Sequence, residues 1–311
     1  MSGLITNPDP THTEAARVRS NGLDLSPAAS SMTSRKALGI VMALTAIIFL
    51  ICCAIPRISQ PQSYHQFADQ RSFLGIPNFG DVISNLAFAL IGLWGLVFLF
   101  QSQISTTVRT FLDKREIWPY SFVFAGLLLT AFGSSYYHLA PDNARLVWDR
   151  LPMTVTFMAM VAAVISERIN LQLGLRLLPI LLLLGLASVL QWYWSEARGM
   201  GDLRFYAAVQ VYSALVILLA LLLPKRYSRS ADFGLIFAFY AIAKIFELFD
   251  VPIFAAIHVV SGHTLKHLAA AAAGFCILRM LQKRTPVAAQ PATFTAESGS
   301  AVPLDSRSSV L

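Results

Sequence analysis

Residues 118–138 read WPYSFVFAGLLLTAFGSSYYH, and residues 147–166 read VWDRLPMTVTFMAMVAAVIS. Each segment has the length and the apolar composition of a helix that crosses a bilayer. The first segment ends in His138, and Asp149 is the third residue of the second segment. Ionisable side chains are costly inside a membrane span, so they usually pair, bind a ligand or take part in chemistry. The two segments therefore predict a membrane fold and the place of a polar site within it.

The composition extends this prediction to the whole chain. Of its 311 residues, 56% are hydrophobic and 13% are charged, against about 25% charged residues in an average soluble protein. We expect an all-α, polytopic transmembrane helix bundle with eight spans, at residues 36–55, 82–101, 118–138, 147–166, 174–193, 205–223, 232–250 and 262–282. The net charge of +7 comes largely from Lys and Arg at span ends, so it does not indicate nucleic-acid binding. The three cysteines lie in apolar segments, and their odd number argues against a disulfide framework.

Four regions follow from this pattern. Residues 1–34 and 285–311 are polar and rich in Ser, Thr, Pro and Ala, which predicts disordered tails. The apolar run within residues 35–56 is long for a signal peptide and no convincing cleavage site follows it, so we expect an extra transmembrane helix that is retained. Residues 57–284 then form a seven-span domain.

The positive charges predict how the chain is oriented. With the N-terminus in the cytoplasm, the cytoplasmic flanks hold fifteen Lys and Arg residues and the opposite loops hold six. This asymmetry predicts a multi-pass protein of the cell membrane with both termini in the cytoplasm. His138, Asp149 and His263 then all fall at the non-cytoplasmic end of the bundle, where we expect the functional site.

His263 and His267 are four residues apart, so they share one helix face and can share one metal ion. Packing at a helix terminus is the alternative for this pair. Ser261 is placed to cap the start of the same helix. With His138 as a third nitrogen ligand, a zinc ion would keep a fourth position open for water. Zinc lowers the pKa of such a water and polarises a bound carbonyl.

Two further side chains would complete a hydrolytic site. Ser134 lies one turn before His138 and could hydrogen-bond a developing oxyanion, although a bond to its own helix backbone is a common alternative. Asp149 could act as a general base, or it could favour the start of its helix through the macrodipole or pair with Arg150. This inventory suits hydrolysis of an amide or ester, and a site embedded in the membrane indicates a lipid substrate.

Other polar residues near this end could bind a lipid head group. The candidates are Glu247, Asp250, Asn143 and Arg145. Lys244 can instead pair with Glu247 within one span, which would reduce the cost of burying both. Lys266 lies beside the histidines in sequence, but we expect it to point to another face of its helix and to reach the membrane interface.

The combination of Ser-x3-His, a nearby Asp and a distal His-x3-His resembles the alkaline ceramidase family. That family belongs to a group of seven-span hydrolase-like proteins that includes the adiponectin and progestin receptors. The segments GSSYYHLAPDNARLVWDRLPM and SGHTLKHLAAAAAG are similar to its bacterial branch. So is NFGDVISNLAFALIG, in which Ser84 and Asn85 resemble the Ser-Asn pair of the first core helix. The similarity covers residues 64–282, and it implies zinc bound by three histidines, a catalytic Ser and Asp, and hydrolysis of the ceramide amide.

Two features depart from that family. The chain adds a span before the seven-span core, and the stretch YHQFADQRSFLGIPNFGD lacks the acidic, Trp-containing calcium motif of the eukaryotic members. It keeps only Asp69, Asn78 and Asp81 as oxygen ligands. Because Ca²⁺ takes six to eight oxygens, this leaves a calcium site doubtful.

We therefore predict a zinc-dependent intramembrane hydrolase that cleaves the amide of a ceramide-like membrane lipid to a sphingoid base and a fatty acid. We expect no obligate protein partner. One alternative is a receptor-like or regulatory protein with a structural zinc site. Another is a proton or metal transporter, but such a protein would more often show internal repeats and broken spans near the membrane midplane.

Overall fold

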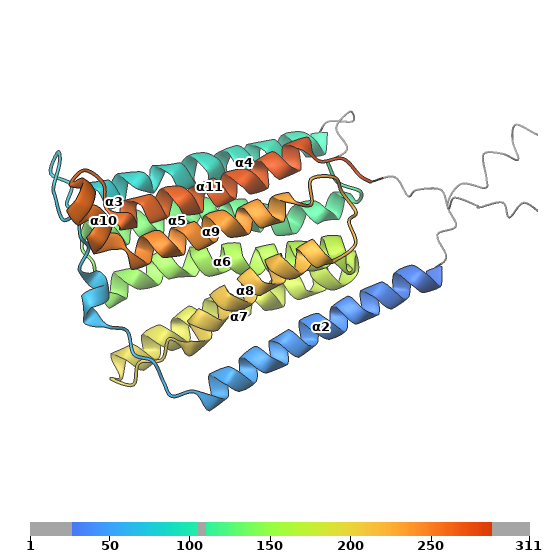
Figure 1. The fold of residues 1–311 in the computed structure, drawn as a ribbon, viewed down its shortest axis with the longest axis horizontal. Coiled ribbons are helices and arrows are strands. Elements are labelled where there is room, and N and C mark those ends of the chain that lie inside the picture. The colour runs from blue at the N-terminus through green and yellow to red at the C-terminus, as the bar shows by residue number, and fades with distance from the viewer. Residues whose placement is uncertain (1–26, 105–109, 288–311) are drawn as a thin grey trace, which may run out of the picture. The chain divides into compact units, whose positions relative to one another are not determined.

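Helices make up nearly all of the regular structure in the computed structural model, which describes residues 27–104 and 110–287 (Figure 1). The long helices are α2 (Pro27–Ala54), α4 (Leu86–Ile104), α5 (Ile117–Leu139), α6 (Asn143–Arg168), α7 (Leu171–Ala197), α8 (Arg204–Leu222), α9 (Asp232–Leu248) and α11 (Gly262–Lys283). The short ones are η1 (Gln62–His65), α3 (Phe79–Ser84), η2 (Lys114–Glu116) and α10 (Asp250–Ile257). The all-α polytopic bundle expected from the sequence is confirmed.

Seven helices in the described part of the chain are long and apolar enough to span a membrane. The one predicted span that is not among these seven, 232–250, is α9, which has 17 residues. At 1.5 Å per residue it is about 25 Å long, short of a hydrocarbon core of about 30 Å. The backbone leaves the helical conformation at Phe249, and the short α10 follows. This break comes at the end of the bundle where α11 begins.

The central helix of the bundle is α6, which packs against α5, α7 and α8. Its second half, from Met158 to Ile165, is a run of small and medium apolar residues that are all buried. Glycines of α5 allow neighbouring helices to approach closely, as small residues generally do in membrane bundles. A Cβ on Gly126 or on Gly133 would clash with the backbone of α6.

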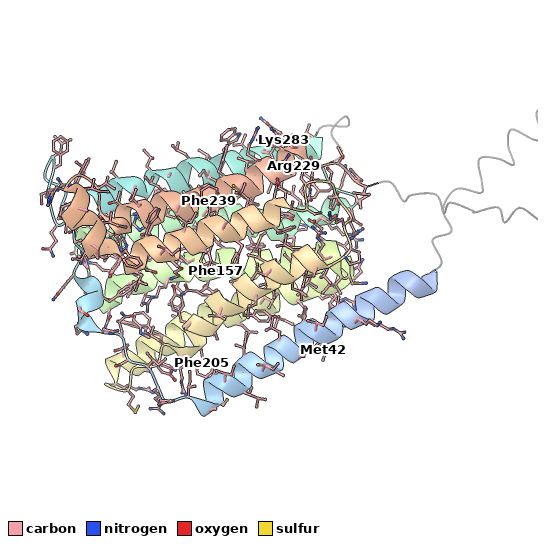
Figure 2. All side chains as sticks on the ribbon, viewed as in Figure 1. Met42, Phe157, Phe205, Arg229, Phe239 and Lys283 are labelled. Carbon is pink, nitrogen blue, oxygen red and sulfur yellow. The ribbon has the colours of Figure 1, made fainter. Side chains whose placement is uncertain are left out.

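The predicted extra N-terminal span, α2, lies at the edge of the bundle and packs against α8 (Figure 1). Only 17% of its most apolar window is buried, against 72% for α6. Side chains such as Met42 point away from the bundle, whereas Phe157 and Phe239 pack against the core (Figure 2). The helix begins at Pro27, inside the predicted tail 1–34, and proline is favoured at the first helical position. The rest of that tail, residues 1–26, lies outside the described residues.

The helices run alternately up and down, so the ends of α5 and the starts of α6 and α11 lie together. We call this the histidine end, because His138, His263 and His267 lie there. Arg229 and Lys283 lie at the opposite end (Figure 2). The predicted span order required His138, Asp149 and His263 to lie at the same end of the bundle, and in the fold they do.

A buried ionic network holds the opposite end together. Arg284 donates to Glu167 at 2.6 Å and to the Thr110 carbonyl at 3.1 Å. Its guanidinium stacks on Tyr227 at 4.0 Å, and Tyr227 in turn donates to Glu116. The predicted tail begins at Thr285, and its first residues also pack against a neighbouring loop: Thr285 hydrogen-bonds Ser228, and the Val287 amide donates to the Arg226 carbonyl. Residues 288–311 lie outside the described part. Cys52, Cys53 and Cys276 are free thiols.

Candidate metal centre

Three buried histidines meet at the histidine end. The ring centroids of His138, His263 and His267 are 4.8–5.0 Å apart in all three pairs. Their candidate ligand atoms lie within 4.8 Å of one another, and each residue is at most 4% exposed. The structure thus brings together the three residues that the sequence predicts as zinc ligands, and the group could hold a metal ion.

The start of α11 fixes two of these histidines. Ser261 caps the helix by accepting a hydrogen bond from the Thr264 amide at 3.0 Å, as predicted. Asp250 accepts from the His263 amide at 2.7 Å, which satisfies another of the free N–H groups of the first turn. A Cβ on Gly262 would lie 2.6 Å from the Asp250 Cα, so glycine is what lets α11 start against the break between α9 and α10.

Asp250 therefore has a different role from the one predicted. Its second carboxylate oxygen accepts from the Ala68 amide at 3.0 Å, so the residue ties α11 to the loop before α3. It does not line the cavity described below. The structure gives it backbone partners in place of a lipid head group.

Hydrogen bonds at His267 assign its free nitrogen. Ser84 donates its single hydroxyl proton to the Asp81 carbonyl at 3.0 Å, because a carbonyl can only accept. Toward His267 Nδ1, 2.8 Å away, the Ser84 oxygen must then accept. Nδ1 carries the proton, and Nε2 keeps the lone pair that a metal needs.

His138 provides a second indication of a metal. Both of its ring nitrogens are buried without a hydrogen-bond partner among the described residues. A buried polar atom without a partner is costly, and native structures usually satisfy it. A metal ion shared with the two imidazoles beside it would occupy one of these two nitrogens, and three imidazoles suit zinc.

Ser134 and Asp149 face each other next to this group. Ser134 lies one turn before His138 on α5, and it lines the same cavity as the Asp149 carboxylate of α6. The two helices touch here, and only glycine permits the contact, because a Cβ on Gly133 would lie 1.9 Å from the Trp148 carbonyl oxygen. Pro152, four residues on, has no N–H to bond that carbonyl, so the glycine contact lies where the α6 backbone is unpaired.

A charged network adjoins the histidines. Glu247 accepts from Lys244 at 2.8 Å, which is the pairing that the sequence predicts as the alternative to head-group binding. It also accepts from Lys266 at 2.9 Å and from the Tyr64 hydroxyl at 3.3 Å. The Lys266 ammonium lies 3.2 Å from His263 Nε2. The expectation that Lys266 points to another face is wrong, because residues three apart are neighbours on a helix surface.

Two other predicted head-group residues lie outside the cavity. Asn143 Oδ1 lies 3.0 Å from His65 Nε2, so it joins α6 to η1. Arg145 packs over the Tyr136 ring at 5.0 Å and donates to the Ala140 carbonyl. Neither residue lines the cavity.

Two of the three residues considered as calcium ligands, Asn78 and Asp81, hold the segments that carry the histidines. Asn78 donates to the His138 carbonyl at 2.8 Å, and Asp81 accepts from the hydroxyls of Thr264 and Ser261 at 2.7 and 3.2 Å. Asp69 pairs with Arg71 at 2.7 Å, and this guanidinium holds the pKa of Asp69 below its usual value. These contacts give Asp69 and one carboxylate oxygen of Asp81 partners inside the protein, while Asp81 Oδ2 is buried without a partner among the described residues. They also make α3 the link between α5 and α11.

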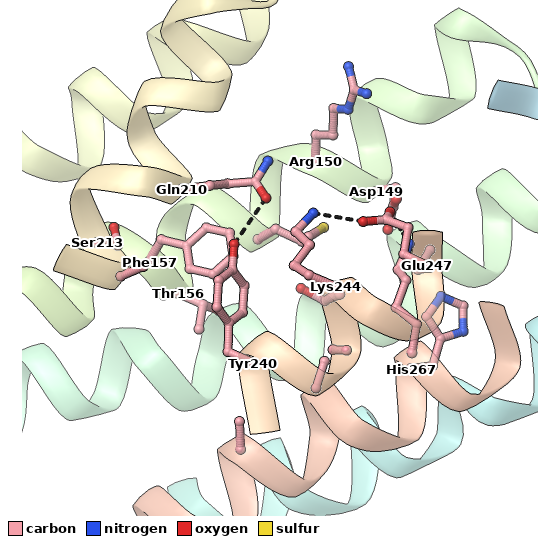
Figure 3. A pocket seen from close by; sticks show the side chains of 18 of the residues that line it. Asp149, Arg150, Thr156, Phe157, Gln210, Ser213, Tyr240, Lys244, Glu247 and His267 are labelled. Carbon is pink, nitrogen blue, oxygen red and sulfur yellow. Dashed lines mark hydrogen bonds and ion pairs between the residues drawn. The ribbon is translucent and has the colours of Figure 1, made fainter. Parts of the chain in front are cut away.

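A cavity of about 370 Å³ opens beside the metal group, between α5, α6, α8, α9 and α11. Its polar end is lined by His267, Ser134, Asp149, Glu247, Lys244 and Lys266 (Figure 3). Its other end is lined by apolar side chains, among them Leu127, Met160, Ile236 and Ile277. Tyr240 and Gln210 bridge α9 and α8 across it with a 3.2 Å hydrogen bond (Figure 3). The arrangement suits an amphipathic ligand whose polar part lies at the histidines.

No protein-family model matches the chain, and no curated protein matches it either. The resemblance to alkaline ceramidases therefore stays a prediction that rests on the residues themselves.

Proposed function

We propose that the protein is a zinc-dependent intramembrane hydrolase that cleaves the amide bond of a ceramide-like N-acyl lipid. The observation that carries the proposal is the meeting of three buried histidines, Ser134 and Asp149 at the polar end of a largely apolar cavity. Following the charge asymmetry of the chain, we place both termini in the cytoplasm and the histidine end at the opposite face of the membrane.

The side chains divide the work of amide hydrolysis. His138, His263 and His267 would hold the zinc, which when bound supplies a Lewis acid for the carbonyl and an open position for water. Asp149 is buried and lines the cavity together with His267, where it could accept the proton of an attacking water and return it to the departing amine nitrogen. Ser134 can donate a hydrogen bond to the carbonyl oxygen as negative charge develops on it.

The shape of the cavity supports a lipid substrate. Its walls toward the middle of the bundle are aliphatic and aromatic, which suits an acyl chain. An acyl chain placed there would direct its carbonyl carbon to the histidine end.

A receptor-like or regulatory protein with a structural zinc is the alternative. Structural zinc sites are closed by four protein ligands. Asp149 is the nearby carboxylate that could close this one, but among the described residues the ligand group consists of the three histidines alone. This geometry favours an open site.

The test is reconstitution with metal. Detergent-purified protein is stripped with a chelator, reloaded with one equivalent of zinc, and supplied with N-acyl lipids of different head groups. We expect free fatty acid to appear only after reloading, and His267→Ala to lose both zinc and turnover. If fully zinc-loaded protein released no fatty acid from any N-acyl or ester lipid, the hydrolase proposal would fail.

A further inference from the structure

Arg150 is a buried cation at the polar end of the cavity. It follows Asp149 on α6, is 4% exposed and lines the cavity wall. The two neighbouring side chains diverge, so Arg150 occupies a different part of the wall from Asp149 (Figure 3). Its guanidinium packs on the rings of Trp192, Tyr206 and Tyr64 at 4.2, 4.6 and 5.5 Å.

This guanidinium has no anionic partner. No carboxylate of the described residues lies within 4.0 Å of it, although most other buried arginines of the bundle have one, such as Arg284. Nη2 donates to Gln60 Oε1 at 2.6 Å, and Nη1 is buried without a partner. Burying an unpaired charge is costly, and stacking on aromatic rings offsets only part of that cost.

The charges lining the cavity are out of balance in the same direction. Three cations, Arg150, Lys244 and Lys266, stand against two carboxylates, Asp149 and Glu247. Glu247 already pairs with both lysines. One carboxylate neutralises only one of these two lysines, so the polar end carries a net positive charge, and a divalent metal at the histidines would add to it. Among the described cations that line the cavity, Arg150 is the one without an ion pair.

We propose that Arg150 binds an anionic oxygen of the substrate head group, a carboxylate or a phosphate. This inference rests on the proposed hydrolase function, and it narrows the substrate from N-acyl lipids in general to those with an anionic head. The planar guanidinium fork matches both kinds of oxyanion. Gln60 and Tyr64 line the same wall and add polar groups beside it.

The experiment compares two pairs of lipids that differ in head-group charge. The first pair is N-oleoylglycine and N-oleoylethanolamine, and the second is ceramide 1-phosphate and ceramide. Wild-type protein, Arg150→Gln and Arg150→Lys are loaded with zinc, and KM, kcat and thermal stabilisation by each lipid are measured. Arg198→Gln is the matched control, because Arg198 also stacks on a tryptophan, Trp194, at 4.9 Å but is exposed and does not line the cavity.

We expect the wild type to favour the anionic lipid over the neutral one in at least one pair. The pair in which this preference appears shows whether the head group carries a carboxylate or a phosphate. Losing a buried charge pair costs 2 kcal/mol or more, so Arg150→Gln should raise KM for that lipid by about 30-fold or more. KM for its neutral counterpart should hardly change. Arg150→Lys should keep part of the preference, and Arg198→Gln all of it.

The proposal is overturned if the wild type binds neutral and anionic lipids equally well, or if Arg150→Gln weakens both to the same extent. Thermal stabilisation needs no turnover, so the two proposals fail separately. An Arg150-dependent preference in binding without hydrolysis would refute the hydrolase and keep the anion site. Efficient hydrolysis of neutral lipids without that preference would refute the anion site and keep the hydrolase.

Discussion

Removing one hydroxyl outside the ligand set should weaken the metal centre. In Ser84→Ala, His267 Nδ1 loses the oxygen that lies 2.8 Å away and accepts its proton. The ring is then free to change tautomer or to turn its lone pair away from His138 and His263. Loss of such an outer hydrogen bond typically lowers metal affinity by about 10–100-fold, which is about 1.4–2.7 kcal/mol of binding free energy.

The assay is competition for zinc with a chelator of known affinity, followed by elemental analysis of the detergent-purified protein. Ser188→Ala is the matched control, because Ser188 is as buried as Ser84, at 6% exposure, but bonds only the Gly185 carbonyl of its own helix. It should bind zinc as the wild type does. The reasoning is refuted if Ser84→Ala holds zinc as tightly as the wild type, or if Ser188→Ala weakens binding equally.

Two other changes test the surroundings of the centre. Gly133→Ala would place a Cβ 1.9 Å from the Trp148 carbonyl oxygen, so we expect a loss of about 1–3 kcal/mol in stability, measured as a lower thermal unfolding temperature. Gly39→Ala on α2 has nothing within 4 Å of its Cβ and should not lower that temperature; equal behaviour of the two variants would contradict the close α5–α6 contact. Glu247→Gln leaves Lys266 unneutralised 3.2 Å from His263, so zinc affinity should fall by about 10-fold or more. The double variant Glu247→Gln/Lys266→Met should recover part of the loss, and a double variant no better than the single one would exclude the lysine charge as the cause.

The span order could be predicted from the sequence because hydropathy and charge report directly on the membrane environment. The placement of His138 at the end of one span and of His263 at the start of another followed from this order. The four-residue spacing of His263 and His267 then predicted that both lie on one helix face. The end of α9 could not be predicted, because apolar residues continue through Phe249 and along α10 after Asp250, and the break lies where the backbone packs against Gly262.

Contacts made by loops explain what the sequence did not reveal. Tyr64, Asp69 and Asn78 belong to the segment before α4, where no period tells which way a side chain points, and two of them were considered as calcium ligands. Their partners Glu247, Arg71 and the His138 carbonyl become evident only in the folded chain. From the sequence, Arg150 is one of the six positive charges on the side opposite the cytoplasmic flanks, but its aromatic surroundings come from three separate segments.

The most direct test of the account is the rate of fatty acid release by Asp149→Asn protein that carries the same zinc content as the wild type. The substitution keeps the size of the side chain and removes the group proposed to accept the proton. General base catalysis contributes about 10²–10⁴-fold, so we predict a rate lower by that factor with zinc still bound by the three histidines. The proposed centre would be contradicted if zinc-loaded Asp149→Asn protein hydrolysed lipid at the wild-type rate. It would also be contradicted if the variant failed to hold zinc.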